Sequence, residues 1–261
     1  MRKGWRAVAL ACGCIALIGL VTACGDEEAT PTGSGGGSVA GTGAVTPLER
    51  RSTLQALAEP PWATESLDTV TFEGTFASFD DSRIASSMGA DGLGRTSAGN
   101  ASAVQKSSFS LDVNQHVTAF SYYDSTSTNG WVNEGGLNPS GSLCMVRAES
   151  TFRFEFTVED TGLILVADGE YRVDDSTFCV FLDVIERDSS QSTTGDLEFD
   201  VCEEIGPGVF TFNDTMGLEI GRFYEVYVST QTSDYFGTSS DNEIQTSGSA
   251  VWDVDFRIER Q

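Results

Sequence analysis

The chain holds few side chains that could act as nucleophile, base or zinc ligand. His116 is its one histidine, so any nucleophile relayed through imidazole would have to use it. No G-x-S-x-G segment presents a serine, and neither H-E-x-x-H nor C-x₂-C spacing occurs to hold zinc. We therefore predict neither a triad hydrolase nor a zinc enzyme, and we place His116 on a partly buried strand.

Acidic residues are the other candidates for catalysis. The chain holds 39 of them, and a glycosidase needs two carboxyl groups roughly 5–10 Å apart across a cleft. Most acids here fall at outward positions of alternating segments, so no pair stands out. We expect a non-catalytic binding or structural protein, and a carbohydrate hydrolase with paired carboxylates is the alternative.

Acidic loops could also hold calcium. Asp124–Glu134 superficially resembles a calcium-binding loop, but Gly130 and Glu134 each lie one position away from the required place. We expect no cofactor apart from the option of a structural calcium ion held by loop carboxylates. The candidate ligands are Asp174, Asp175, Asp234 and Asp241, with Asp80-Asp81 as a further acidic loop.

Large rings in polar segments are candidates for ligand binding. They are Trp131, Tyr122 and Tyr123 in one segment, and Tyr235 and Phe236 in another. Aromatic side chains in loops at the end of a sandwich can stack on sugars or hold a protein partner. The other interpretation is that they fold back over the end of the core. Trp252 differs, because the alternation around it predicts a core position.

Three cysteines lie in the second half of the chain: Cys144, Cys179 and Cys202. An exported protein meets an oxidising compartment, where cysteines are expected to pair. If residues 178–187 and 194–203 form a hairpin, Cys179 and Cys202 lie opposite each other. We predict this disulfide, which would close a loop of about 24 residues and contribute roughly 3 kcal/mol. Cys144 is then a buried small apolar residue or an alternative partner.

The first 24 residues predict export. Arg2, Lys3 and Arg6 precede an uncharged run, Ala7–Ala23, which ends in small side chains and is typical of a signal peptide. The run is short for a spanning helix, which needs roughly 20 residues. Its end, Val21-Thr22-Ala23-Cys24, resembles the lipobox of bacterial lipoproteins. The resemblance implies cleavage before Cys24 and acylation of that cysteine.

The residue after Cys24 bears on location. The resemblance implies retention at the inner membrane when aspartate directly follows the cysteine, and here Gly25 does. We therefore expect the outer membrane or the cell surface rather than the inner membrane.

The net charge of the chain limits the classes of partner that it can bind. Removal of residues 1–23 leaves 12 basic and 39 acidic residues, a net charge near −27. This balance opposes binding to nucleic acid and to anionic lipid headgroups. We expect a monomer that meets the membrane through its lipid, with a glycan or an envelope protein as its further partner.

Composition divides the chain into three parts. Gly25–Thr46 is rich in Gly, Ser and Thr and is expected to be a disordered tether. Pro47–Ala58 is expected to form a short helix that ends at Pro60-Pro61. The predicted parts are a signal peptide at 1–23, a lipidated linker at 24–59 and one domain at 60–261.

From Trp62 onward the dominant period is two. Apolar and polar residues alternate through Phe152–Val158 and through Ala250–Ile258, which puts one face of each segment in a core. Eight or nine such segments predict an all-β fold, a single antiparallel β-sandwich of jelly-roll type. Asp80–Lys106, rich in Ser, Gly and Ala, is expected to be a long loop or weak edge structure.

One segment resembles a known motif. Leu218–Val226 matches the pattern L-x-x-G-x-x-Y-x-V, which is similar to a turn and strand of exported bacterial β-sandwich modules. These include carbohydrate-binding-type jelly rolls and ectodomains of surface proteins. The resemblance extends over residues 152–258 and implies a fold, not a function. Gly221 would permit a tight turn, after which Tyr224, Val226 and Val228 point inward.

Overall fold

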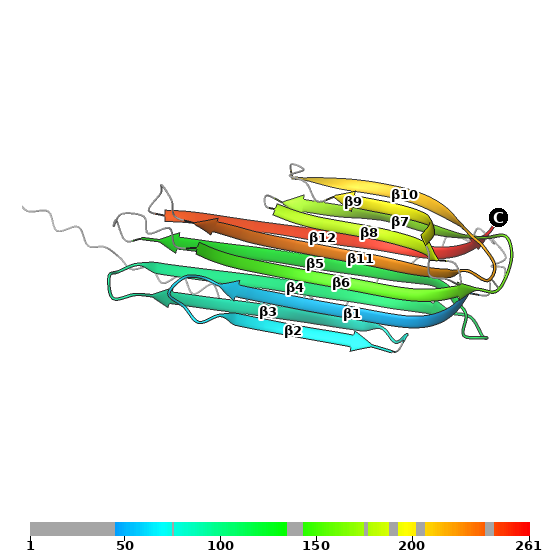
Figure 1. The fold of residues 1–261 in the computed structure, drawn as a ribbon, viewed down its shortest axis with the longest axis horizontal. Coiled ribbons are helices and arrows are strands. Elements are labelled where there is room, and N and C mark those ends of the chain that lie inside the picture. Colours follow the sequence, from blue (N-terminus) through cyan, green and yellow to red (C-terminus); the bar gives the residue numbers. More distant parts are fainter. Residues whose placement is uncertain are drawn as a thin grey trace, which may run out of the picture. The chain divides into compact units, whose positions relative to one another are not determined.

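The computed structural model of the protein is built from strands (Figure 1). It describes residues 45–261 apart from residues 75, 135–142, 175–176, 188–192, 202–206 and 238–242. Within these described residues there is no helix, and twelve strands form two antiparallel six-stranded sheets. The strands are β1 (Val45–Glu59), β2 (Ser66–Glu73), β3 (Phe79–Ala90), β4 (Thr96–Leu111), β5 (Val117–Asn133), β6 (Leu143–Val158), β7 (Leu163–Asp174), β8 (Thr177–Arg187), β9 (Thr193–Val201), β10 (Gly208–Leu218), β11 (Phe223–Gly237) and β12 (Glu243–Arg260).

Strands β5–β12 wind as a jelly roll. Sheet A has the order β2-β1-β6-β11-β8-β9, and sheet B has the order β10-β7-β12-β5-β4-β3. The last four strands of sheet A and the first four of sheet B are the two halves of a jelly roll. The remaining strands, β1–β4, add a pair to each sheet and are called the extension. The predicted antiparallel sandwich of jelly-roll type is confirmed.

Alternation explains the central strands. Phe152, Phe154 and Phe156 of β6 are buried, as are Trp252 and Phe256 of β12. These residues belong to one apolar cluster that joins the two sheets. The predicted core faces of both segments are therefore confirmed.

The turn before β11 has its predicted form. Gly221 has φ of +78°, a conformation that glycine adopts without steric cost, and its N–H donates to the Val158 carbonyl at 2.8 Å. Tyr224, Val226 and Val228 then follow at buried positions. The motif thus turns the chain and starts a strand of the jelly-roll core.

A belt of buried polar residues divides the interior. One apolar cluster lies mainly inside the jelly roll, and a second, smaller one is built from β1, β3 and β4 of the extension together with the adjoining ends of β5 and β6. Along β5, β6 and β11, the inward positions between the two clusters are polar: Asp124, Thr126, Thr128, Ser150, Thr230, Thr232 and Asp234. They bond across the sandwich, as where Thr126 meets Thr232 at 2.6 Å. These bonds satisfy groups that would otherwise oppose burial.

The segment Pro47–Ala58 is a strand rather than the predicted helix. It lies within β1, which pairs with β2 on one side and with β6 on the other. Its inward residues Leu54, Ala56 and Ala58 are fully buried. Pairing and burial override the helix propensity of these residues. The sandwich therefore begins at Val45 rather than near Trp62, and residues 45–59 do not belong to the linker.

Residues 80–106 form most of the hairpin β3–β4 rather than the predicted long loop. Ala85, Ala101 and Ala103 are buried at inward positions, and β4 pairs with β5 along its length. Gly89 is also required, because a Cβ there would lie 2.1 Å from the Trp62 carbonyl oxygen. The Ser, Gly and Ala residues that suggested a loop thus allow the strands and sheets to pack closely. The twelve strands of the described residues exceed the eight or nine expected.

Candidate functional site

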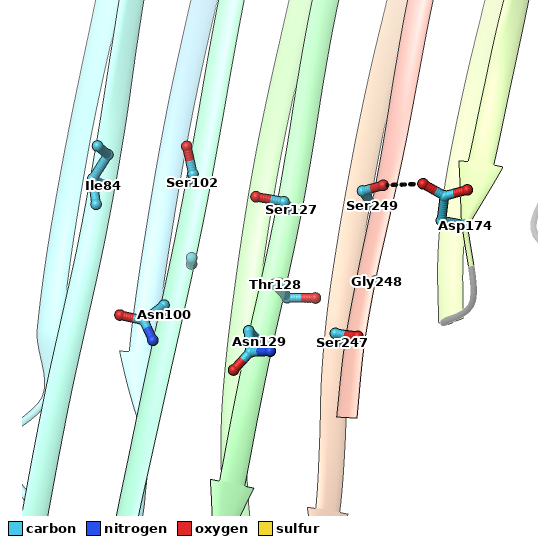
Figure 2. A pocket seen from close by; sticks show the side chains of 11 residues that line it. Ile84, Asn100, Ser102, Ser127, Thr128, Asn129, Asp174, Ser247, Gly248 and Ser249 are labelled. Carbon is cyan, nitrogen blue, oxygen red and sulfur yellow. Dashed lines mark hydrogen bonds between the residues drawn. The ribbon is translucent and has the colours of Figure 1, made fainter. Parts of the chain in front are cut away.

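A hollow on the outer face of sheet B is the candidate binding site (Figure 2). Its volume is about 410 Å³ and it is open to solvent; ligand sites have volumes of roughly 300–1,000 Å³. We call this hollow the groove. Its lining residues are Ile84, Asn100, Ala101, Ser102, Ser127, Thr128, Asn129, Asp174, Ser247, Gly248 and Ser249.

Strand alternation determines which side chains reach the groove. On β5, Ser127 and Asn129 are partly exposed, whereas Thr126 and Thr128 are buried between the sheets. Thr128 donates its hydroxyl inward to Asp234 at 2.6 Å, so it contributes only the floor. The same period of two applies on the neighbouring strands.

Register aligns the outward side chains into two rows that cross the strands. The first row is Ser102, Ser127, Ser249 and Asp174. The second row is Asn100, Asn129 and Ser247. Figure 2 shows both rows, and in it Ser249 donates its hydroxyl to Asp174 Oδ2 at 2.9 Å.

The groove has a neutral, hydrogen-bonding chemistry. Its hydroxyl and amide side chains can both donate and accept. No lysine or arginine is among its lining residues, and Asp174 is their single carboxylate. The groove therefore suits an uncharged ligand with many hydroxyl groups and offers no cation to a phosphate or carboxylate.

Trp131 borders the groove from strand β5 rather than from the predicted loop. It lies two positions beyond Asn129, on the same outward face. Its cross-strand partner is Ala98, whose own partner on β3 is Met88, a side chain that is 79% exposed. A row with apolar side chains thus runs beside the polar rows.

Tyr122 is buried, so the prediction that it contacts a ligand is wrong. Its hydroxyl donates to Asp124 and lies 3.0 Å from Ser150 Oγ inside the sandwich. Burial and the Asp124 charge raise its pKa well above the usual value. The strand turns even-numbered residues inward here, and Tyr123 therefore faces outward on sheet B, opposite Lys106.

The other predicted aromatic residues do not join Trp131. Tyr235 is on β11, 68% exposed, next to the inward-facing Asp234, and so it lies on the outer face of sheet A. The side chain of Phe236 falls outside the described residues. Trp131 and Tyr235 therefore lie on the outer faces of different sheets and do not form one binding surface.

The predicted calcium ligands have separate partners. Asp174 lies in the groove and binds Ser249, whereas Asp234 is buried and binds Thr128. Asp175 and Asp241 lie outside the described residues, and the candidate loop at 124–134 belongs almost entirely to strand β5. Across the described ranges, no three His, Cys, Asp or Glu side chains are placed to hold a metal ion.

Acidic residues of β12 and β7 pair across the strands on the outer face of sheet B, away from the groove, and Asp255 with Asp168 is one such pair. Asp253 of β12 and Glu170 of β7 are cross-strand partners. Burial, followed by the charges of Asp255 and Glu170, raises the pKa of Asp253. Arg172 donates to Glu170 Oε1 at 2.6 Å.

The cysteines have different outcomes. Cys144 is a free thiol, fully buried in the smaller apolar cluster, and burial raises its pKa to about 12; its interpretation as a buried apolar residue is confirmed. Cys24, Cys202 and the side chain of Cys179 lie outside the described residues. The predicted register between β8 and β9 is confirmed, because Val180 pairs with Val201.

His116 also differs from its prediction. It is partly buried but lies in the turn before β5, where its Nδ1 is 3.2 Å from Asp112 Oδ2. Apart from Asp174, which was predicted as a calcium ligand, the groove residues were not predicted. Their signal is the recurrence of Ser and Asn at every second position in Asn100–Ser102, Ser125–Asn129 and Ser247–Ser249.

Comparison with known proteins does not identify a family. No protein-family model and no curated protein matches the chain. Among solved structures, the crystal structure of the infectious bursal disease virus VP2 subviral particle aligns at a TM-score of 0.27 with 9% identity, covering 86% of this chain and 73% of that one. The structure of the Gx strain of the same virus aligns at a TM-score of 0.26 with 7% identity, covering 86% and 73%. Alignments this weak carry no argument, and the fold is assigned from the strand order alone.

Among the described residues, no helix has the length and apolar character that crossing a membrane requires.

Proposed function

We propose that the protein is a lipid-anchored, non-catalytic binding protein of the cell envelope that holds a glycan in the groove. The groove carries this proposal, because its volume of about 410 Å³ is lined by hydroxyl and amide side chains. Such groups match the hydroxyls of a sugar, which also both donate and accept. A protein partner would instead be expected to use aromatic or arginine anchors, and none of these lines the groove.

The proposed anchor is supported by the sequence. A basic start, an apolar run and Cys24 follow one another in the order of a lipoprotein signal, and two or more acyl chains attach a protein stably to a membrane. Because the sandwich begins at Val45, residues 25–44 would serve as the tether. A Gly-rich coil of this length spans roughly 25 Å. Gly25 after the cysteine favours the outer membrane or the cell surface.

Glycan binding by the full chain in detergent tests the proposal. Ser127→Trp places a large ring in the middle of the groove, and we expect it to abolish binding to an immobilised glycan panel. Thr151→Trp makes the same change on β6, in the outer face of sheet A, and is the matched control. Loss of binding in both variants, or retention in both, would contradict the groove as the site.

A carbohydrate hydrolase is the second candidate, favoured by one observation. Asp253 and Glu170 are opposite each other on the face that holds the groove, and the raised pKa of Asp253 is a property of general acids. Release of reducing ends by the wild type but not by Asp253→Asn would support this candidate. No release from any glycan that binds would remove it.

A further inference from the structure

We infer that the groove takes a neutral glycan chain lying across the strands, with one sugar ring stacked on Trp131. This inference rests on the proposed function and specifies the class of ligand, its direction and the residue that selects it. It is argued from the shape of the groove, its charge and the row of side chains beside it.

The groove is long across the strands and narrow along them. Its lining reaches from Ile84 on β3 to Asp174 on β7, so it crosses four gaps between neighbouring strands, or roughly 19 Å. Along each strand it covers only the two polar rows, roughly 7 Å. Figure 2 shows this arrangement, with the lining side chains spread over neighbouring strands. An extended chain crossing the strands fits these proportions better than a single compact sugar.

Charge excludes an anionic chain. The lining offers no ammonium or guanidinium group, and one end of the groove carries the Asp174 carboxylate. On the same face, Asp253 adds a further negative charge along β12, and Arg172, two positions from Asp174 on β7, is bound to Glu170. A uronate or phosphate group placed here would lose water without gaining a cation. A neutral chain loses no charge and can use every hydroxyl and amide.

Trp131 supplies the flat apolar surface that the polar rows lack. It follows Asn129 by two positions on the same face, a step of roughly 7 Å. Ala98 and Met88 continue this row across β4 and β3. A pyranose ring has an apolar face of C–H groups and a polar rim. Its face can pack on the indole ring while its rim reaches the Asn129 amide.

Titration of the full chain in detergent with defined hexasaccharides tests the inference. The neutral probes are cellohexaose, maltohexaose and xylohexaose, and the anionic probe is hexagalacturonate. We expect at least one neutral probe to bind and hexagalacturonate not to bind at low salt. We expect Trp131→Ala to weaken neutral binding at least tenfold, and Trp131→Phe to restore most of it.

A matched variant separates this inference from the proposed function. Tyr235→Ala removes an exposed ring from sheet A and should leave the Kd unchanged. If Ser127→Trp abolishes binding while Trp131→Ala does not weaken it, the stacking role is wrong and the proposed function stands. Equal binding of hexagalacturonate would overturn the neutral class. Binding of no probe and no glycan in the panel would overturn the proposed function itself.

Discussion

Thr230 Oγ1 on β11 donates a hydrogen bond of 2.9 Å to Asp124 Oδ1 on β5 and so joins sheet A to sheet B. The same carboxylate also accepts from the Tyr122 hydroxyl and from the Trp252 backbone N–H. Burial outweighs these bonds and raises the pKa of Asp124 to about 7. The polar belt is therefore built around an acid that holds its proton near neutral pH.

The stability of the fold should respond to this acid. Its pKa rises from 3.8, the ordinary value expected in the unfolded chain, to about 7 in the fold. The folded state therefore binds the proton more tightly than the unfolded chain does. The resulting gain in the free energy of unfolding is fully present below pH 3.8 and is lost as pH rises through 7. When pH is raised from 5 to 8, we expect deprotonation of Asp124 to lower the free energy of unfolding by roughly 3 kcal/mol. Urea denaturation at the two pH values measures this change.

Asp124→Asn is the control for this pH dependence. It keeps the shape of the side chain and removes the titration, so its stability should change much less between pH 5 and pH 8. The difference between the two proteins isolates Asp124 from acids such as Asp91 and Asp112, whose pKa values are lowered. Identical pH profiles for wild type and variant would show that Asp124 does not titrate in this range.

Strand β1 should contribute to stability like any core strand. Leu54 is fully buried, so Leu54→Ala is expected to lower the free energy of unfolding by roughly 2–4 kcal/mol. Gln55→Ala changes the next residue, which points outward, and should cost less than about 0.5 kcal/mol. Equal effects of the two substitutions in urea denaturation would argue against burial of β1.

The disulfide between Cys179 and Cys202 remains a prediction, but the register between β8 and β9 that it requires is confirmed. Val180 and Val201 are cross-strand partners, and in the sequence Cys179 directly precedes the first and Cys202 directly follows the second. Non-reducing peptide mapping should recover them as one linked pair, with Cys144 as a free thiol. Recovery of all three as free thiols from protein exported by its own host would refute the pairing.

Lipid attachment should depend on Cys24 alone. Cells grown with labelled palmitate should label the wild-type protein, and Cys24→Ser should lose the label. Cys14→Ser alters a cysteine within the apolar run and should keep it. Label retained in Cys24→Ser would place the lipid elsewhere or show that the signal is not a lipobox.

The strands with large apolar residues were predictable, and those with small ones were not. In β6 and β12 the alternating Phe, Val and Trp side chains bury large areas, and a period of two is then unambiguous. In β1 and β4 the inward positions hold residues such as Ala56, Ala101 and Ala103, which bury little area and do not distinguish strand from helix or loop. Long-range pairing decides the structure there.

The groove was hidden for a different reason. Ser127 and Asn129 carry no distinctive signal by themselves, and their neighbours Ser249 and Ser247 come from β12, far along the chain. Only the register of the finished sheet places them side by side. The burial of Asp124 was equally inaccessible, because an aspartate in a Ser- and Thr-rich segment indicates an exposed position.

The groove crosses the boundary between the extension and the jelly roll, since β3 and β4 form one part of its lining and β12 and β7 the other. Beneath the groove, the polar belt separates the two apolar clusters of the interior. Separate clusters are a basis for local opening, in which one part of a domain unfolds while the rest holds. A glycan chain bound in the groove would contact both parts and hold them together. Amide hydrogen exchange in β3 and β4 would then slow far more than in β11, and occupancy of the groove would set how often the sandwich opens.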